Sequence, residues 1–136
     1  MYLSSIQCGI QSAHVVAEMF IKYRGLAAES TLIEWATNHK TMILLNGGYQ
    51  SELEEFYNYV LTAGRDQTNH YPFAIFHEEL DALNGATTSV GIILPEKVYA
   101  ATAEVREGLK ETIFWDQLND YERGIVVRLS RLKLAQ

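Results

Sequence analysis

The chain opens with a segment that alternates in polarity and leads directly into one with helical spacing. Residues 2–7 alternate apolar and small polar side chains, and Cys8-Gly9 interrupts this pattern. The apolar residues that follow recur at helical spacing, which predicts a helix ending near Gly25. In open sheets with parallel strands, backbone N–H groups and the helix dipole point to the place where a strand ends and a helix begins. We therefore expect any functional site to involve the corner from Cys8 to His14.

The size, cysteine content and charge of the chain limit the classes of protein to which it can belong. The chain has 136 residues and one cysteine, which indicates one domain that folds without a disulfide. It contains no basic segment followed by an apolar run and no stretch of about twenty apolar residues, so we expect a cytoplasmic protein with no membrane contact. The formal net charge is −6. Because nucleic-acid binding depends on clustered cations, a long nucleic acid is disfavoured as a partner, whereas a small nucleotide is not.

Four short apolar segments have the character of strands. They are residues 2–7, 41–45, 73–77 and 88–94, and the second is apolar enough to be buried on both faces. Helical patterns lie between most of them, with the clearest turn signal at Asn46-Gly47-Gly48. Helical connections between apolar strands predict an α/β fold, a mixed four-stranded sheet with helices on both faces.

The C-terminal segment has a separate character. We assign residues 1–111 to the α/β domain and residues 112–136 to a helical extension of it. Residues 112–115 are expected to be extended, and residues 117–133 to form an amphipathic helix that begins at Asp116. Its apolar stripe consists of Leu118, Tyr121, Ile125, Leu129 and Leu132. The stripe either covers the core of this domain or binds a second copy, and we expect a homo-oligomer formed through this helix.

Several local patterns occur together in a characteristic order. They are Gln11-Ser12-Ala13-His14 at the first helix, Trp35 followed by the segment Lys40–Leu45, and Gly85-Ala86-Thr87-Thr88 with Gly91 and Pro95. In this order, over roughly residues 2–109, the chain resembles the peptidyl-tRNA hydrolase type 2 family. The resemblance implies the α/β fold predicted above, with a binding cleft at the first helix.

The chain departs from that family at the residues that carry its chemistry. Gln7 occupies the position of the family's active-site lysine, and the Gly-Lys-rich loop is missing. The family's Asp-Ala-Gly-x-Thr motif is replaced by His77-Glu78-Glu79-Leu80-Asp81, although Thr88 matches a later threonine. These changes remove groups that hold a phosphate and orient a water molecule. We therefore expect the fold without the activity, with no cofactor and no known catalytic residue.

The preferred hypothesis is a non-catalytic protein that binds or sequesters a small polar or nucleotide-like ligand, such as a signalling nucleotide. Hydrogen-bonding groups expected at the ends of the strands and the start of the first helix would form its site. The candidate ligand-binding residues are Gln7, Gln11, His14, His77, Glu78, Thr87 and Thr88.

Two other functions remain open. A divergent hydrolase of peptidyl-tRNA or a related ester would use some of His14, His77, Glu78, Asp81 and Thr88. A protein–protein interaction module would act through the C-terminal helix. A Cys8 nucleophile with His14 as base lacks an evident third group, and the spacing of the four histidines does not predict a metal site.

Overall fold

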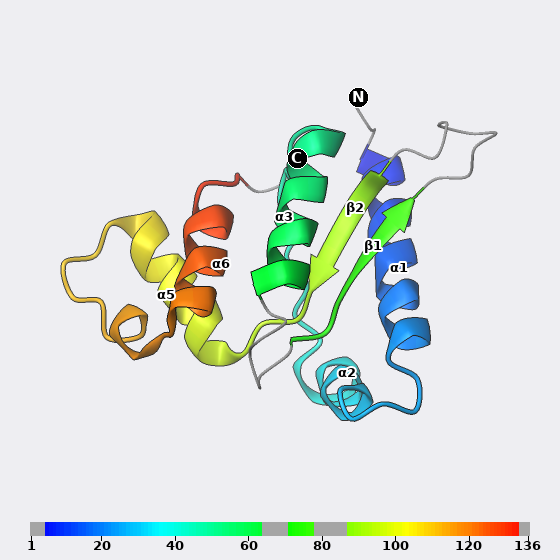
Figure 1. The fold of residues 1–136 in the computed structure, drawn as a ribbon, viewed down its shortest axis with the longest axis horizontal. Coiled ribbons are helices and arrows are strands. Elements are labelled where there is room, and N and C mark those ends of the chain that lie inside the picture. Colours follow the sequence, from blue (N-terminus) through cyan, green and yellow to red (C-terminus); the bar gives the residue numbers. More distant parts are fainter. Residues whose placement is uncertain (1–4, 64–70, 78–86, 134–136) are drawn as a thin grey trace.

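A computed structural model describes residues 5–63, 71–77 and 87–133 of the chain. Helices dominate it, and its one sheet has two strands (Figure 1). In chain order the elements are α1 (Ser5–Lys22), α2 (Glu29–Glu34), a π-helical turn η1 (Trp35–His39), α3 (Gln50–Ala63), β1 (Phe73–His77), β2 (Thr87–Ile92), α5 (Glu96–Glu107), a 3₁₀ turn η2 (Trp115–Gln117) and α6 (Asp120–Ser130).

The predicted four-stranded mixed sheet is wrong. Across the described residues only β1 and β2 pair, and they are antiparallel, with Phe73 opposite Ile92 and His77 opposite Thr87. The third and fourth predicted strands therefore form, whereas the first two do not join the sheet. A strand needs a neighbour to satisfy its backbone groups, and a hairpin finds that neighbour close by in the sequence.

The start of the chain is helical from Ser5, so the predicted strand over residues 2–7 is wrong where it is described. Residues 1–4 lie outside the described part of the chain. Gly9 does not end the helix, because a helix interior tolerates an isolated glycine at a cost of about 1 kcal/mol. The helix instead ends at Lys22, and Gly25 adopts the expected left-handed conformation with φ of 74°.

The second predicted strand, residues 41–45, is an extended segment at the surface. Trp35 donates from its indole nitrogen to the carbonyl of Thr41 at 2.8 Å, which fixes the start of this segment. Met42, Ile43 and Leu44 are 55%, 41% and 37% exposed, so the expectation of burial on both faces is wrong. A short apolar run predicts either a strand or another buried segment, but here only its last residue, Leu45, forms an isolated bridge and packs against a buried cluster that includes Val98 and Ile125.

The predicted turn at residues 46–48 is confirmed. The side chain of Asn46 accepts a hydrogen bond from the backbone of Gly48, whose φ is 85°. The helix that follows begins at Gln50, and the Glu52 carboxylate accepts a hydrogen bond from the backbone N–H of Tyr49 at 2.8 Å.

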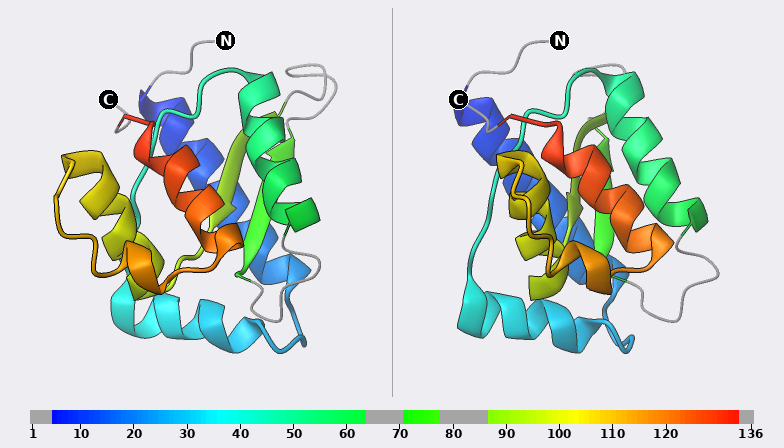
Figure 2. Two further views of the ribbon diagram at one scale, coloured as in Figure 1. Left: turned by 60° about the vertical axis from the view of Figure 1, so that its left-hand side comes forward. Right: turned by 90° about the vertical axis from the view of Figure 1, so that its left-hand side faces the viewer.

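The hairpin lies between two helices. α1 packs against one face of the sheet, and α3 packs against the other (Figures 1 and 2). On the α1 side Ala74 pairs with Gly91, and a Cβ at Gly91 would lie 2.6 Å from the Met19 methyl carbon. This small pair lets α1 approach the strands closely. The core on this side of the sheet consists of Val15, Met19, Tyr23, Leu32 and Ala74.

A second core lies between α5 and α6. Pro95 immediately precedes α5. The C-terminal helix α6 begins after Asn119 rather than after Asp116, with a capping box formed by Asn119 and Glu122. The apolar stripe of the C-terminal helix packs into this core, which consists of Tyr71, Val98, Ala101, Leu118, Tyr121, Ile125, Val126 and Leu129. The stripe thus covers the chain's own core, and the expected oligomer stays a prediction.

None of the helices that the structure describes is both long and apolar enough to cross a bilayer.

Candidate functional site

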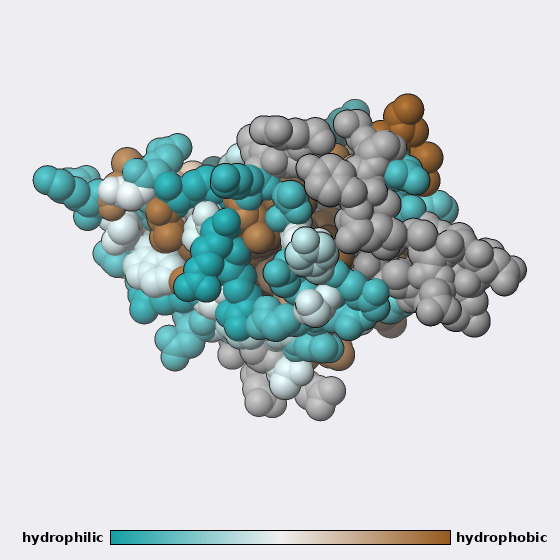
Figure 3. All heavy atoms as spheres, turned by 90° about the horizontal axis from the view of Figure 1, so that it is seen from above, coloured by the Kyte–Doolittle hydropathy of each residue, from teal (hydrophilic) through white to brown (hydrophobic). Residues whose placement is uncertain are grey.

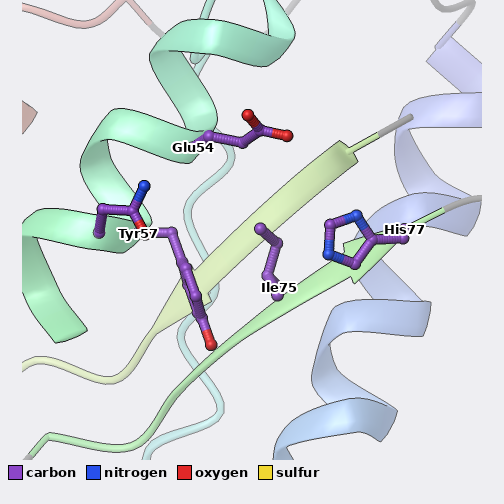
Figure 4. Close-up of a pocket in the computed structure, with 5 residues that line it drawn as sticks. Glu54, Tyr57, Ile75 and His77 are labelled. Atoms are coloured by element: carbon purple, nitrogen blue, oxygen red, sulfur yellow. The ribbon is translucent and has the colours of Figure 1, made fainter. Parts of the chain in front are cut away.

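A hollow of about 210 Å³ lies between α3 and the end of β1 (Figure 4). It is lined by Glu54, Tyr57, Asn58, Ile75 and His77. Figure 4 shows the Tyr57 ring beside β1, with Ile75 between it and the imidazole of His77. The arrangement combines an aromatic wall and an aliphatic floor with carboxylate, amide and imidazole groups.

Two regular periodicities place these side chains together. Glu54, Tyr57 and Asn58 are three and four residues apart on α3, so they share one helical face. Ile75 and His77 are two residues apart on β1, so both face α3. The Tyr57 ring packs against that of Phe73 in a tilted arrangement with centroids 5.5 Å apart, which holds the aromatic wall in place.

A lysine closes the opposite end of β1. The ammonium of Lys22 lies 3.7 Å from the centroid of the Phe73 ring and donates to the Phe73 carbonyl at 2.9 Å. Burial lowers the pKa of Lys22 because the charged form is less well solvated there. The Tyr23 hydroxyl accepts from the Phe73 backbone N–H at 3.0 Å, and burial is the main cause that raises the pKa of Tyr23. This end of the strand is therefore anchored to α1.

The structure brings several of the predicted binding residues to one end of the sheet but divides them between its two faces. The His14 ring stacks on Phe76, on the α1 side, with centroids 4.4 Å apart and an interplanar angle of 4°. His77 is the next residue of β1 and therefore faces α3. The two histidines thus do not share one cleft.

The other candidates have varied surroundings. Gln11 is buried, and its backbone carbonyl accepts from the Ser89 hydroxyl at 3.0 Å. Gln7 is exposed on the first turns of α1. Thr87 pairs with His77 across the hairpin, and Thr88 follows it in β2. Glu78 and Asp81 lie outside the described residues.

The described residues do not bring together the groups that a hydrolase would need. Cys8 and His14 both lie within α1 and are six residues apart, which places them on well-separated sides of the helix rather than across a strand–helix corner. His39 lies 3.6 Å from Glu34 at the surface, far along the chain from either residue. Within the described ranges there is no group of three or more His, Cys, Asp or Glu side chains that could hold a metal ion.

Comparisons with protein-family models, characterised proteins and solved structures find no match to this chain. Only the residues of the site itself therefore indicate a function.

Sequence reasoning named only one residue of the hollow, His77. Its other members look like ordinary helix and strand residues, since Tyr57 belongs to the apolar stripe of α3 and Glu54 to its first turns. Their role depends on α3 packing against β1, a contact that periodicity does not specify. The sequence signal that could have indicated these residues is the spacing of Glu54, Tyr57 and Asn58, at positions i, i+3 and i+4 of one predicted helix.

Proposed function

We propose that this protein is a non-catalytic binding protein that holds the planar heterocycle of a nucleotide-like ligand in the hollow between α3 and β1. The observation that carries the proposal is the set of groups around the hollow, an aromatic ring and an aliphatic floor with three different hydrogen-bonding side chains. Binding pockets typically combine a largely apolar wall with a few polar groups that fix orientation.

The size of the hollow supports binding of one end of a ligand. Pockets for whole drug-sized ligands typically span about 300–1,000 Å³. The hollow, at about 210 Å³, suits a single heterocycle whose remaining parts extend into solvent. The Tyr57 ring provides a surface for stacking, which contributes about 1–3 kcal/mol per base in single-stranded nucleic-acid complexes.

The charges around the hollow favour binding of the ligand's heterocycle over binding of its phosphate. None of the five lining residues is a lysine or arginine, and Glu54 contributes a carboxylate. An ionised carboxylate only accepts hydrogen bonds, so the edge of the ligand that meets it has to carry N–H groups. A base such as guanine, which has adjacent N–H donors, meets this requirement.

Binding without turnover suits a scarce ligand, because one protein molecule then removes one ligand molecule from solution. A signalling nucleotide is such a ligand. Of the residues that a divergent hydrolase would use, His14 and His77 lie on opposite faces of the sheet, whereas Glu78 and Asp81 lie outside the described residues.

Native mass spectrometry of the freshly purified protein, followed by calorimetric titration with guanine, adenine and cytosine nucleotides, tests the proposal. We expect a guanine nucleotide to bind and Glu54→Gln to weaken binding at least tenfold, because hydrogen bonds to charged groups contribute about 1.5–3 kcal/mol. Glu55→Gln is the matched control, since Glu55 lies next to Glu54 on α3 but pairs with Arg128 outside the hollow.

Two results would contradict the proposal. One is the absence of binding for every nucleotide up to about 1 mM, where the standard free energy of binding is about −4 kcal/mol. The other is an unchanged affinity in both Glu54→Gln and Asn58→Ala, with far-UV circular dichroism showing that both variants fold.

A further inference from the structure

α1 is apolar on two opposite sides. Its inner side packs against the sheet, as described above. On the outer side Ile6, Ile10 and Ile21 are 76%, 50% and 69% exposed, and Ala13 and Ala17 between them are also exposed. A helix on the surface of a monomer normally has one apolar stripe, which faces the core. The outer side of α1 therefore has the composition of a buried surface without a covering layer.

The outer residues form one continuous stripe. They follow one another at intervals of four, three, four and four residues, which is the spacing of a helix–helix seam. From Ile6 to Ile21 this seam runs for about 22 Å along α1. Figure 3 looks onto the end of the molecule where α1 begins and shows hydrophobic surface projecting at the upper right margin.

We propose that the outer stripe of α1 binds the same stripe of a second copy of this chain, with the two helices antiparallel about a two-fold axis. Such an isologous interface requires a surface that is complementary to itself. In antiparallel order Ile6 lies opposite the second copy's Ile21, and Ile10 lies opposite its Ala17. The larger Ile10 thus meets the smaller Ala17 on both sides of the axis, isoleucine meets isoleucine at the two ends of the stripe, and Ala13 lies close to the axis.

The distribution of charge favours a second copy over other partners. Glu18 and Lys22 are the charged residues of α1, and Lys22 is folded against the sheet. The stripe has no lysine or arginine to attract a nucleic acid or an anionic lipid surface. Two copies with a net charge of −6 repel each other over most of their surface, so an uncharged face is where they can approach.

The area of the outer stripe limits the affinity that we expect for the dimer. A seam about 22 Å long and about 10 Å wide has a footprint of about 220 Å², whereas a stable interface buries about 800 Å² on each partner. We therefore expect a dimer of moderate affinity that dissociates on dilution.

Sedimentation velocity over a range of about 1–500 µM tests this interface, since the dissociation constant of a moderate dimer falls within that range. We expect the parent protein to shift from monomer to dimer as its concentration rises. Ala13→Glu should weaken the dimer at least tenfold, because it places two carboxylates near the axis. Ile113→Glu is the control, since Ile113 is 60% exposed but lies between α5 and α6.

Disulfide cross-linking tests the orientation. In a background of Cys8→Ser, a mixture of the variants Ile6→Cys and Ile21→Cys should form a mixed disulfide, whereas a parallel arrangement would give only disulfides between identical variants. Circular dichroism checks that each variant folds. If Ala13→Glu does not fold, Ala17→Glu takes its place in the sedimentation experiment.

Three outcomes would overturn the inference. These are a monomer at every concentration, a dimer that is unaffected by both Ala13→Glu and Ala17→Glu, and binding of the monomer to neutral lipid vesicles through the same residues. None of them depends on whether a nucleotide binds in the hollow, because the hollow lies on the other side of the sheet.

Discussion

At the scale of single residues, two glycines in helices occupy opposite environments. In α6 a Cβ at Gly124 would overlap the hydroxyl of Tyr59. That ring cannot easily move, because its hydroxyl donates to the Tyr121 carbonyl at 3.1 Å and the Arg128 guanidinium lies 3.7 Å from its centroid. In α1 a Cβ at Gly9 would meet no atom within 4 Å. The first glycine is therefore required by packing, and the second is not.

Replacing each glycine with alanine should change stability in opposite directions. Gly9→Ala should stabilise the protein by about 0.5–1 kcal/mol, because alanine favours helix by that amount. Gly124→Ala should lose about 1 kcal/mol or more despite the same gain, since overpacking costs about 1–3 kcal/mol. Urea denaturation of dilute protein measures both changes. A Gly124→Ala variant as stable as the parent would show that Tyr59 does not pack there.

At the scale of elements, one carboxylate joins the C-terminal core. Glu122 of α6 is buried, accepts from the Tyr71 hydroxyl ahead of β1, and lies 3.2 Å from the Lys97 ammonium of α5. The backbone N–H of Asn119 also donates to it, at 3.0 Å. Burial alone would raise the pKa of Glu122, but these donors outweigh it and hold the pKa below the usual 4.5.

Glu122→Gln should therefore alter the dependence of stability on pH. Because the pKa of the folded protein is lowered, this group's contribution is fully present above pH 4.5 and is lost as the pH falls through the folded-state pKa. The variant should be less stable at pH 7 by about 2 kcal/mol and should lose less stability than the parent on acidification. Glu107→Gln, at an exposed position of α5, is the control. Parallel pH profiles for Glu122→Gln and the parent would contradict this assignment.

The sequence predicts correctly those elements whose signals come from residues that are close together in the chain. Residues 73–77 form β1 with the predicted bounds, and the predicted turn forms at residues 46–48. The segments 2–7 and 41–45 were misassigned, because alternation and apolar character do not show whether a distant strand is available for pairing. The candidate site was predicted only at His77, since its other groups are assembled by the packing of α3 on the sheet.

At the scale of the whole molecule, the hairpin separates two surfaces with different properties. The hollow lies on the face of the sheet that α3 covers. α1 covers the opposite face, and its outer apolar stripe is directed away from the sheet. Ligand binding and self-association would therefore be independent, because a dimer formed through α1 leaves the hollow open. α3 also contacts α6, which links the hairpin to the C-terminal core.

The parallel stack of His14 on Phe76 has a spectroscopic consequence. Protons held above the face of an aromatic ring are shielded by its ring current, so the imidazole signals of His14 should lie upfield of those of a histidine in water. His14 belongs to α1 and Phe76 to β1, so these signals report contact between the helix and the hairpin. A Phe76→Leu variant should return them to ordinary positions. Proton NMR can then detect the separation of α1 from the sheet during unfolding, without an added label.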